Sequence, residues 1–345
     1  MLRTRVTEEY GIQAPIVLAP MGFVAMPPLA AAVSNAGGLG LIGAGAAPPP
    51  VLEEMIHATR ALTAAPFGVG FLIVDTAFGP STVEEHLAVV IAERLPVVVF
   101  HWDLPPRAWV DELHRGRARV WLQVGSVARA RDAVALGADA VICQAAEAGG
   151  HNHSATPLLS LLPAMVHAIR PTPVIAAGGI ADGHALAAAL LLGADAACLG
   201  TRFVASAEAN AHPEHQRRIV AARAGDTAFT QIFGPEWPDG RVRTLRNRVV
   251  DEWRGRDDRT PPQPDPPQCI GTTLLGGAEY RMPKFSAVLP TPETSGDFEE
   301  MCLLAGESAA VIRAVAPADE IVRDLVGEAE SLLGARPLPS PGAVR

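Results

Sequence analysis

The chain of 345 residues is long for one compact domain, and its 49% of apolar residues can form a large core. Its formal net charge of −9 argues against a general role in binding nucleic acid or an anionic membrane surface. No run of about 18 residues is apolar without Gly, Asn or Asp, and the N-terminus has no apolar signal region, so we expect neither a membrane span nor a leader.

In chain order, the first 225 residues or so alternate between short apolar runs and helical patterns. The runs are apolar throughout, which is typical of parallel strands buried on both faces. We expect eight strands, at 15–19, 39–42, 67–73, 96–100, 119–124, 139–143, 173–176 and 195–199. A helix is expected after each strand, at 28–35, 48–63, 82–94, 106–115, 126–136, 158–169, 182–192 and 213–224.

Two segments repeat the same junction between a helix and a strand. Ala-Leu-Gly-Ala-Asp-Ala-Val at 135–141 and Leu-Leu-Gly-Ala-Asp-Ala-Ala at 191–197 each place a glycine where a helix ends and a strand begins. Such a junction is what a repeated αβ unit needs. Together with the eight alternating strands and helices, it predicts an α/β fold, a (β/α)8 TIM barrel with a smaller inserted cap domain. A doubly wound parallel sheet is the alternative.

The cap is expected where the alternation ends, over residues 225–297. Residues 233–240 have the composition of a loop, and the proline run 261–267 can form neither a helix nor a central strand. Between them, 241–256 carries many arginines and is expected to be a helix with a solvated face.

The chain is expected to return to the barrel after the cap. Helical patterns occur near 298–315 and 318–333, and a loose tail begins near 337. We therefore expect a cofactor-binding barrel over 1–224 and returning helices with a tail over 298–345.

Glycines follow the last three expected strands, where the loops of a β/α barrel build the active site. They occur at 149–150, 178–179 and in Gly200-Thr201. Glycine-rich turns that lead into helices expose backbone N–H groups, and barrels often bind phosphate with the loops after strands seven and eight. A phosphate-bearing cofactor is therefore plausible, whereas the lack of a Gly-x-Gly-x-x-Gly after the first strand argues against a Rossmann dinucleotide site.

His151 is the main candidate for catalysis, because it follows the Gly149-Gly150 turn and an imidazole there can act as a base or a donor. Glu147 is expected to support the same loop by hydrogen bonds. His101, after the fourth strand, either lines the pocket or lies at its rim. The role of His153 stays open.

The remaining histidines are expected to serve the surface or the fold. His57, His86 and His114 lie on expected helices and are placed at the surface. His212 and His215 have no nearby Cys or carboxylate that would complete a metal site, so no metal is expected.

Five motifs in sequence resemble the nitronate monooxygenase family, formerly called 2-nitropropane dioxygenases, which is related to enoyl-ACP reductase II. They are Ala19-Pro20-Met21, Ser34-Asn35-Ala36-Gly37-Gly38-Leu39-Gly40, Glu147-Ala148-Gly149-Gly150-His151, Ala176-Ala177-Gly178-Gly179-Ile180-Ala181-Asp182-Gly183 and Leu199-Gly200-Thr201-Arg202-Phe203. The resemblance implies an FMN-dependent β/α barrel.

The resemblance also implies roles for individual residues. Gly179, Gly200 and Thr201 would hold the FMN phosphate, and His151 would be the catalytic residue. The full cofactor-binding set that it implies is Ala19, Pro20, Met21, Gly22, Gln123, Gln144, Ala148, Gly149, Gly150, Ala177, Gly178, Gly179, Leu199, Gly200 and Thr201. The chain differs from the family at Gly70, Ala145 and Glu307, where relatives often have Asn, Gly and Gln.

The resemblance implies an FMN-dependent monooxygenase that oxidises alkyl nitronates, or nitroalkanes, with O2. The alternatives are an FMN-dependent NAD(P)H reductase of an enoyl thioester or a quinone, and a non-catalytic flavin-binding protein. The expected partners are a small-molecule substrate and O2, and a homo-oligomer is left open. Four cysteines without paired spacing fit a reducing cytosol, so a cytoplasmic location is expected.

Overall fold

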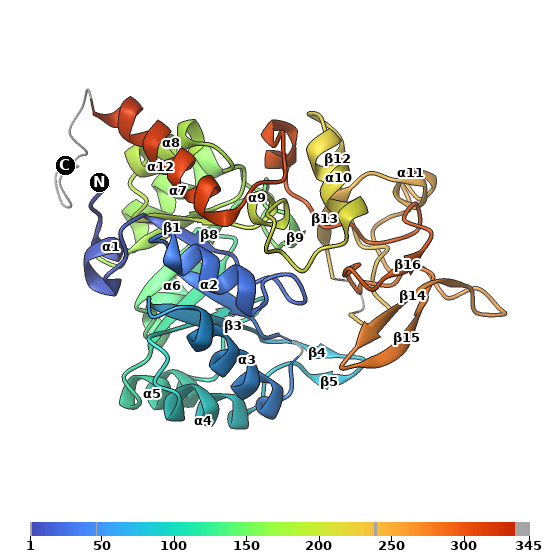
Figure 1. The fold of residues 1–345 in the computed structure, drawn as a ribbon, viewed down its shortest axis with the longest axis horizontal. Coiled ribbons are helices and arrows are strands. Elements are labelled where there is room, and N and C mark those ends of the chain that lie inside the picture. Colours follow the sequence, from blue (N-terminus) through green and yellow to red (C-terminus); the bar gives the residue numbers. More distant parts are fainter. Residues whose placement is uncertain (1, 46, 238–239, 335–345) are drawn as a thin grey trace.

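A computed structural model describes residues 2–45, 47–237 and 240–334; the tail expected from 337 lies outside this part. Eight parallel strands form one sheet in the order β1-β11-β10-β8-β7-β6-β3-β2. A parallel bridge between Val17 and Leu39 joins β1 to the start of β2, so the sheet closes into a barrel (Figure 1). The strands are β1 (Ile16–Leu18), β2 (Gly40–Gly43), β3 (Phe67–Leu72), β6 (Val97–His101), β7 (Arg119–Val124), β8 (Ala140–Gln144), β10 (Val174–Ala177) and β11 (Ala196–Leu199).

The helices follow the strands as the alternation predicts, and the expectation of a TIM barrel is confirmed. Ser126 and Asp182 cap α6 (Val127–Leu136) and α8 (Gly183–Leu191), because each side chain accepts a hydrogen bond from the backbone N–H three residues later. The helices after the strands are α2 (Pro27–Asn35), α3 (Pro49–Leu62), α4 (Glu84–Ala92), α5 (Arg107–Arg115), α6 (Val127–Leu136), α7 (Leu158–Ala168), α8 (Gly183–Leu191) and α10 (Pro213–Ala221). The short helix α9 (Thr201–Val204), directly after β11, was not anticipated.

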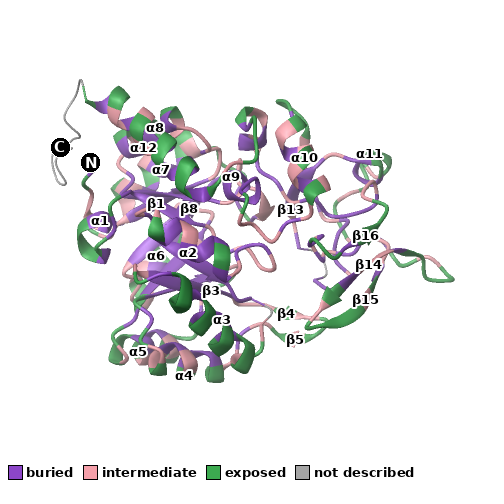
Figure 2. Ribbon diagram, in the orientation of Figure 1, coloured by how far each residue is buried: buried purple, intermediate pink, exposed green. Residues whose placement is uncertain are grey.

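The barrel has an apolar core on each side of its strands. One core lies between the strands and the surrounding helices, and the other fills the barrel interior around the fully buried Trp121 (Figure 2). Helix α1 (Arg5–Tyr10), which was not anticipated, packs against the interior core. The Trp121 indole N–H donates a 2.8 Å hydrogen bond to the Tyr10 hydroxyl, which satisfies both buried polar groups.

Beyond the barrel, the chain forms two small antiparallel sheets, shown at the right of Figure 1. One sheet has the order β12-β13-β9 and the other β15-β14-β16. Their strands are β9 (Gly150–His151), β12 (Thr227–Thr230), β13 (Val242–Leu245), β14 (Cys269–Leu275), β15 (Ala278–Pro283) and β16 (Ser295–Gly296). The first sheet therefore joins the loop that carries His151 to a strand about ninety residues later.

The prediction of an arginine-rich helix over 241–256 is wrong. Residues 242–245 form the buried strand β13, and only α11 (Arg248–Glu252) is helical. The reason lies in the spacing, because Arg241 and Arg243 are two residues apart and both guanidinium groups lie over the Phe229 ring of the paired strand β12.

The prediction of a helix over 298–315 is also wrong, since only the 3-10 helix Glu307–Val311 forms there. Thr244 of β13 pairs with Leu304, so this stretch runs extended beside β13. Helix α12 (Ala318–Leu333) forms as expected and packs against α8 and α2. The boundaries near 224 and 297 stay a prediction.

The proline run 261–267 forms neither helix nor strand, as expected. An additional hairpin, β4 (Asp75–Thr76) and β5 (Gly79–Pro80), follows β3 and was not anticipated. Among the described residues, no helix combines the length and apolar character that a membrane crossing requires.

Candidate active site

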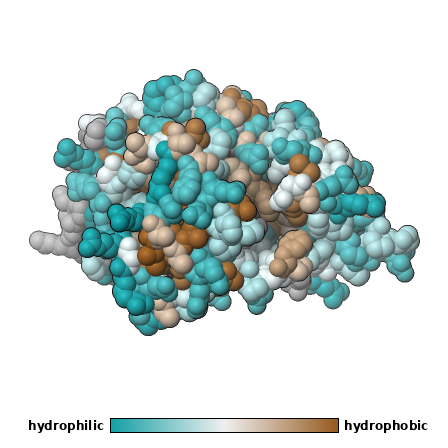
Figure 3. Space-filling view, turned by 60° about the horizontal axis from the view of Figure 1, so that its bottom comes forward, coloured by the Kyte–Doolittle hydropathy of each residue, from teal (hydrophilic) through white to brown (hydrophobic). Residues whose placement is uncertain are grey.

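One cavity of about 800 Å³ lies at the carboxyl ends of the barrel strands and is partly covered by the C-terminal sheets. In the space-filling view, hydrophobic side chains gather around a hollow on this face (Figure 3). The structure brings the whole expected set together, because each of these residues lines the cavity: Ala19, Pro20, Met21, Gly22, Gln123, Gln144, Ala148, Gly149, Gly150, His151, Ala177, Gly178, Gly179, Leu199, Gly200 and Thr201.

The loop after β8 is held from within by its own polar side chains. The Gln144 amide N–H donates a 2.9 Å hydrogen bond to the His151 carbonyl. Both carboxylate oxygens of Glu147 accept from the Leu158 N–H at the start of α7, so Glu147 supports the loop as expected. Asn152 is fully buried and its amide donates to the Ala145 carbonyl at 2.9 Å. These bonds fix the backbone on both sides of His151.

Two arginines at β13, in the part of the chain that follows the barrel, hold the same loop through hydrogen bonds from outside. The Arg241 guanidinium donates to the carbonyls of Asn152 and Ser154 at 3.0 and 2.6 Å. The Arg243 guanidinium donates to the Ala146 carbonyl at 3.0 Å and to the Glu307 carboxylate at 2.5 Å. These arginines therefore hold the loop that carries His151, in place of the solvated role expected from the sequence.

The turn at Gly149 and Gly150 allows this close packing. A Cβ at Gly149 would lie 2.5 Å from the carbonyl carbon of Ala305, so no other residue fits there without a shift of the backbone. Gly150 has φ +78, a conformation that favours glycine. The glycines of the motif are therefore required to bring β9 against the C-terminal part.

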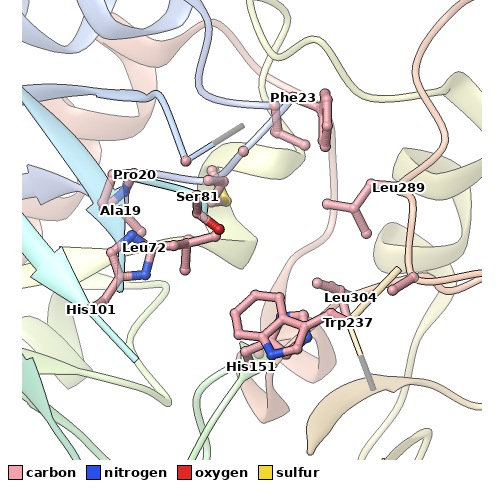
Figure 4. A pocket seen from close by; sticks show the side chains of 18 of the residues that line it. Ala19, Pro20, Phe23, Leu72, Ser81, His101, His151, Trp237, Leu289 and Leu304 are labelled. Atoms are coloured by element: carbon pink, nitrogen blue, oxygen red, sulfur yellow. The ribbon is translucent and has the colours of Figure 1, made fainter. Parts of the chain in front are cut away.

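His151 lies in an aromatic environment at the end of the cavity (Figure 4). The Trp237 ring stacks on its imidazole with centroids 3.6 Å apart, and the Trp102 ring meets it edge-on at 5.6 Å. Burial, together with the nearby His101 and His153 rings, lowers the pKa of His151 to about 3. The imidazole is therefore neutral near pH 7, with one nitrogen that can donate a hydrogen bond and one that can accept.

His101 and His153 belong to the same region. The His101 ring lines the cavity rather than its rim, and burial lowers its pKa to about 4. The His153 ring lies over Trp102 with centroids 3.8 Å apart. The structure thus places three imidazoles around the end of β6 and the loop after β8.

The expectation that His86 lies at the surface is wrong. Its side chain is buried, Nδ1 accepts from the Val83 N–H, and Nε2 lies 2.8 Å from the Ala47 carbonyl oxygen. Position in a helix did not reveal this, because α4 turns that residue toward the barrel. His57 and His114 are exposed, as expected.

His212 and His215 have roles in the fold. The His212 Nδ1 accepts from the Glu214 N–H at the start of α10. His215 is buried, with Nε2 3.1 Å from the Leu304 carbonyl oxygen, and its ring also lines the cavity.

Gly70 has a packing reason that the sequence did not show. A Cβ at this position would lie 2.2 Å from the Cβ of Pro20, so the first loop occupies the space that a side chain would need. In this chain a larger residue such as Asn therefore has no room at position 70 unless Pro20 moves.

The C-terminal part contributes cavity residues that sequence reasoning missed. Trp237 and Glu236 come from the expected loop, and Tyr280 and Leu289 come from the second small sheet and the segment after it. The buried Glu236 carboxylate accepts from the Tyr280 hydroxyl at 2.7 Å and from the Ser286 hydroxyl at 2.6 Å. No signal in the sequence connects these segments with the barrel loops, since they are far away along the chain.

The charge of the cavity limits what it can bind. Its lining, taken over the described residues, includes Glu147, Glu236 and Glu279 but no Lys or Arg. Anionic groups must therefore be met there by backbone N–H groups and neutral side chains. Gly178 and Gly179 have φ values of +112 and +74 and turn the backbone at the end of β10. Gly200 and the first turn of α9 lie at the end of the neighbouring β11.

Comparisons with known proteins agree with this architecture. A family model described as nitronate monooxygenase matches residues 3–328. A nitronate monooxygenase of Paraburkholderia phytofirmans is 32% identical, over 92% of this chain and 93% of that protein. Among solved structures, the nitroalkane oxidase of Streptomyces ansochromogenes has a TM-score of 0.79 and 30% identity, covering 96% of this chain and 99% of that one. FabK from Thermotoga maritima has a TM-score of 0.77 and 32% identity, covering 97% and 98%.

Proposed function

This chain belongs to the nitronate monooxygenase family, and from that premise we propose that it is an FMN-dependent monooxygenase that oxidises alkyl nitronates with O2. The observation that carries the proposal is the His151 imidazole, which is neutral near pH 7 and borders a largely apolar cavity at the strand ends of the barrel. An imidazole in this state can take a proton from a neutral nitroalkane or donate a hydrogen bond to a nitronate oxygen.

The residues at the strand ends fit an FMN molecule. The glycine turns after β10 and β11 lie side by side and line the cavity, where backbone N–H groups rather than a cationic side chain would meet a phosphate. Gly179, Gly200 and Thr201 would hold the phosphate, and the Gln123 and Gln144 amides would meet the ring or the ribityl chain. When bound, FMN supplies the exchange of electrons between the substrate and O2.

The protein residues have separate tasks in this proposal. His151 binds or deprotonates the substrate, and the hydrogen bond from Gln144 to its carbonyl keeps its backbone in place. Trp237 covers one face of the imidazole and limits its contact with water. Arg241 and Arg243 hold the loop that carries His151 and act through it rather than on the substrate.

The alternative, an FMN-dependent reductase that uses NAD(P)H, draws support from the likeness to FabK. The charge of the cavity speaks against it, because a dinucleotide or a coenzyme A thioester brings several phosphates and the described lining offers them no Lys or Arg. A nitronate brings one delocalised negative charge, which neutral donors can satisfy.

The test is turnover by the purified, FMN-loaded protein. We expect O2 consumption with propyl-2-nitronate and little flavin bleaching on anaerobic mixing with NADH or NADPH. His151→Ala should retain FMN but lose most turnover of neutral 2-nitropropane. Rapid bleaching by NAD(P)H without nitronate turnover would instead support the reductase, and no turnover with either would indicate a flavin-binding protein without this activity.

A further inference from the structure

A second imidazole of the cavity, that of His101, is not explained by the proposed role of His151. His101 is the last residue of β6, and its ring lies beside Pro20 and Leu72 in the close-up of the cavity (Figure 4). Its Nε2 atom is buried and has no hydrogen-bond partner among the described residues, a condition that the Nε2 of His151 shares. Buried polar atoms are nearly always paired in native proteins, so a bound molecule is the natural source of the missing partner.

His101 and Ser81 are polar groups that this wall of the cavity offers, and only His101 carries an imidazole. The neighbouring strand β3 can present no side chain at Gly70, because a Cβ there would meet the Pro20 ring at 2.2 Å. That Cβ position lies 3.7 Å from the His101 Nε2. The His101 imidazole therefore lies beside the position that a side chain from β3 would otherwise occupy.

The backbone directly after His101 is strained in a way that favours a functional site. Trp102 has φ +81, a strained conformation that is rare for a bulky residue. In this conformation the Trp102 ring contacts His151, His153 and Trp237. The strained turn thus fixes the His101 side of the cavity relative to the His151 side.

We propose that His101 is a second substrate-binding residue, whose neutral imidazole donates a hydrogen bond to an oxygen of a planar anionic group bound beside His151. The proposal rests on the proposed function for the identity of that group as a nitronate. Since the described lining contains no Lys or Arg, the oxygens of such an anion need neutral donors, and a neutral imidazole carries one N–H. With His101 binding an oxygen, His151 is left to take the proton from the carbon when the neutral nitroalkane is bound, which leaves the nitronate.

The His101 and His151 imidazoles suit these two roles, binding an oxygen and taking a proton, because both are uncharged near pH 7. Burial lowers the pKa of His101 to about 4, and the His101 ring contributes to the low pKa of His151. A competing role is to hold one water, because His101 and His151 also border a small cavity of about 20 Å³, which is enough for one molecule. The experiment has to separate these two roles.

The probe is butanoate, an unreactive planar anion, with butanamide as the uncharged analogue. Each is titrated into the FMN-loaded protein and followed by the flavin absorbance and by tryptophan fluorescence, since Trp237 lines the cavity and Trp102 contacts it. His101→Phe keeps a ring and removes the donor, and His101→Gln keeps a donor. The control is His114→Gln, an exposed imidazole that lines neither cavity.

We expect His101→Phe to weaken butanoate binding by about ten- to a hundredfold and butanamide binding much less, as for the loss of one hydrogen bond to a charged group. His101→Gln should restore binding to within a few-fold of the original protein, and His114→Gln should leave it unchanged. With propyl-2-nitronate, His101→Phe should raise KM by a similar factor.

An unchanged dissociation constant for butanoate in folded, FMN-loaded His101→Phe would overturn the proposal and favour the water-holding role. So would a loss of affinity in which butanamide follows butanoate. Failure of the proposed function appears differently, as a protein that binds butanoate through His101 but consumes no O2 with nitronate.

Discussion

The ion pair between Arg243 and Glu307 should stabilise both the fold and the loop that carries His151. The change to test is Arg243→Met, which keeps an unbranched apolar stem and removes the guanidinium. The Arg243 side chain is 11% exposed and donates to Ala146, Thr227 and Glu307. Its removal leaves a backbone carbonyl, a hydroxyl and a carboxylate without this donor.

The magnitude follows from the burial of the two partners. Breaking a fully buried ion pair costs about 3–5 kcal/mol. The Glu307 side chain is 38% exposed, so water can solvate it after the change, and we expect Arg243→Met to lower the free energy of unfolding by about 2–3 kcal/mol. Glu307→Gln, which keeps the side-chain shape, should cost about 1 kcal/mol.

The assay is urea unfolding of both single variants and the double variant, which gives the coupling energy of the pair. We expect a coupling of about 1 kcal/mol. The control is Arg217→Met, since Arg217 is 66% exposed and pairs with Glu214 on the surface of α10, and its cost should stay below about 0.5 kcal/mol. A coupling below about 0.3 kcal/mol, or equal costs for the Arg243 and Arg217 changes, would refute the reasoning.

Three further predictions concern packing, pH and the covered imidazole. Gly70→Ala forces a Cβ against the proline of the first loop and should cost about 1–3 kcal/mol in urea unfolding, whereas Gly327→Ala, with open space in α12, should be neutral or stabilising by up to about 1 kcal/mol. Burial lowers the pKa of His215 to about 4, so the unfolded chain binds a proton below about pH 6.5 that the folded chain excludes. The free energy of unfolding should therefore fall by about 3 kcal/mol from this group between about pH 6.5 and 4, and His215→Gln should show a shallower pH dependence. Trp237→Ala opens His151 to water, so the acid limb of kcat/KM for 2-nitropropane should move to higher pH; an unmoved limb would show that the indole does not set that pKa.

The barrel could be predicted from the sequence because its strands carry a local signal. A parallel strand buried on both faces is apolar along its whole length, and two of the helix-to-strand junctions, at 135–141 and 191–197, repeat the same sequence around a glycine. The strand-end loops converge in any closed barrel, so residues as distant as Pro20 and Thr201 could be assigned to one cavity without knowledge of their contacts.

The remainder depends on contacts between distant segments, which leave no local pattern. Arg243 looks like a surface residue until its partners, about a hundred residues earlier and sixty later, are known. His86 and Trp237 illustrate the same limit, because the helix of one and the loop of the other gave no sign of which face meets the barrel. The stretch after 298 resembles a helix by composition, yet its pairing with β13 outweighs that preference.

The pairing of β9 with β13 has a consequence for attempts to recombine this protein with its relatives. His151 lies opposite Val242, so a strand from the C-terminal half aligns the backbone of the loop that carries this imidazole. A chimera that exchanges residues 225–317 to obtain new substrate preferences would also exchange that alignment. This part of the cavity lining and the placement of His151 are thus inherited together, and a productive graft has to preserve Val242 and the arginines on either side of it.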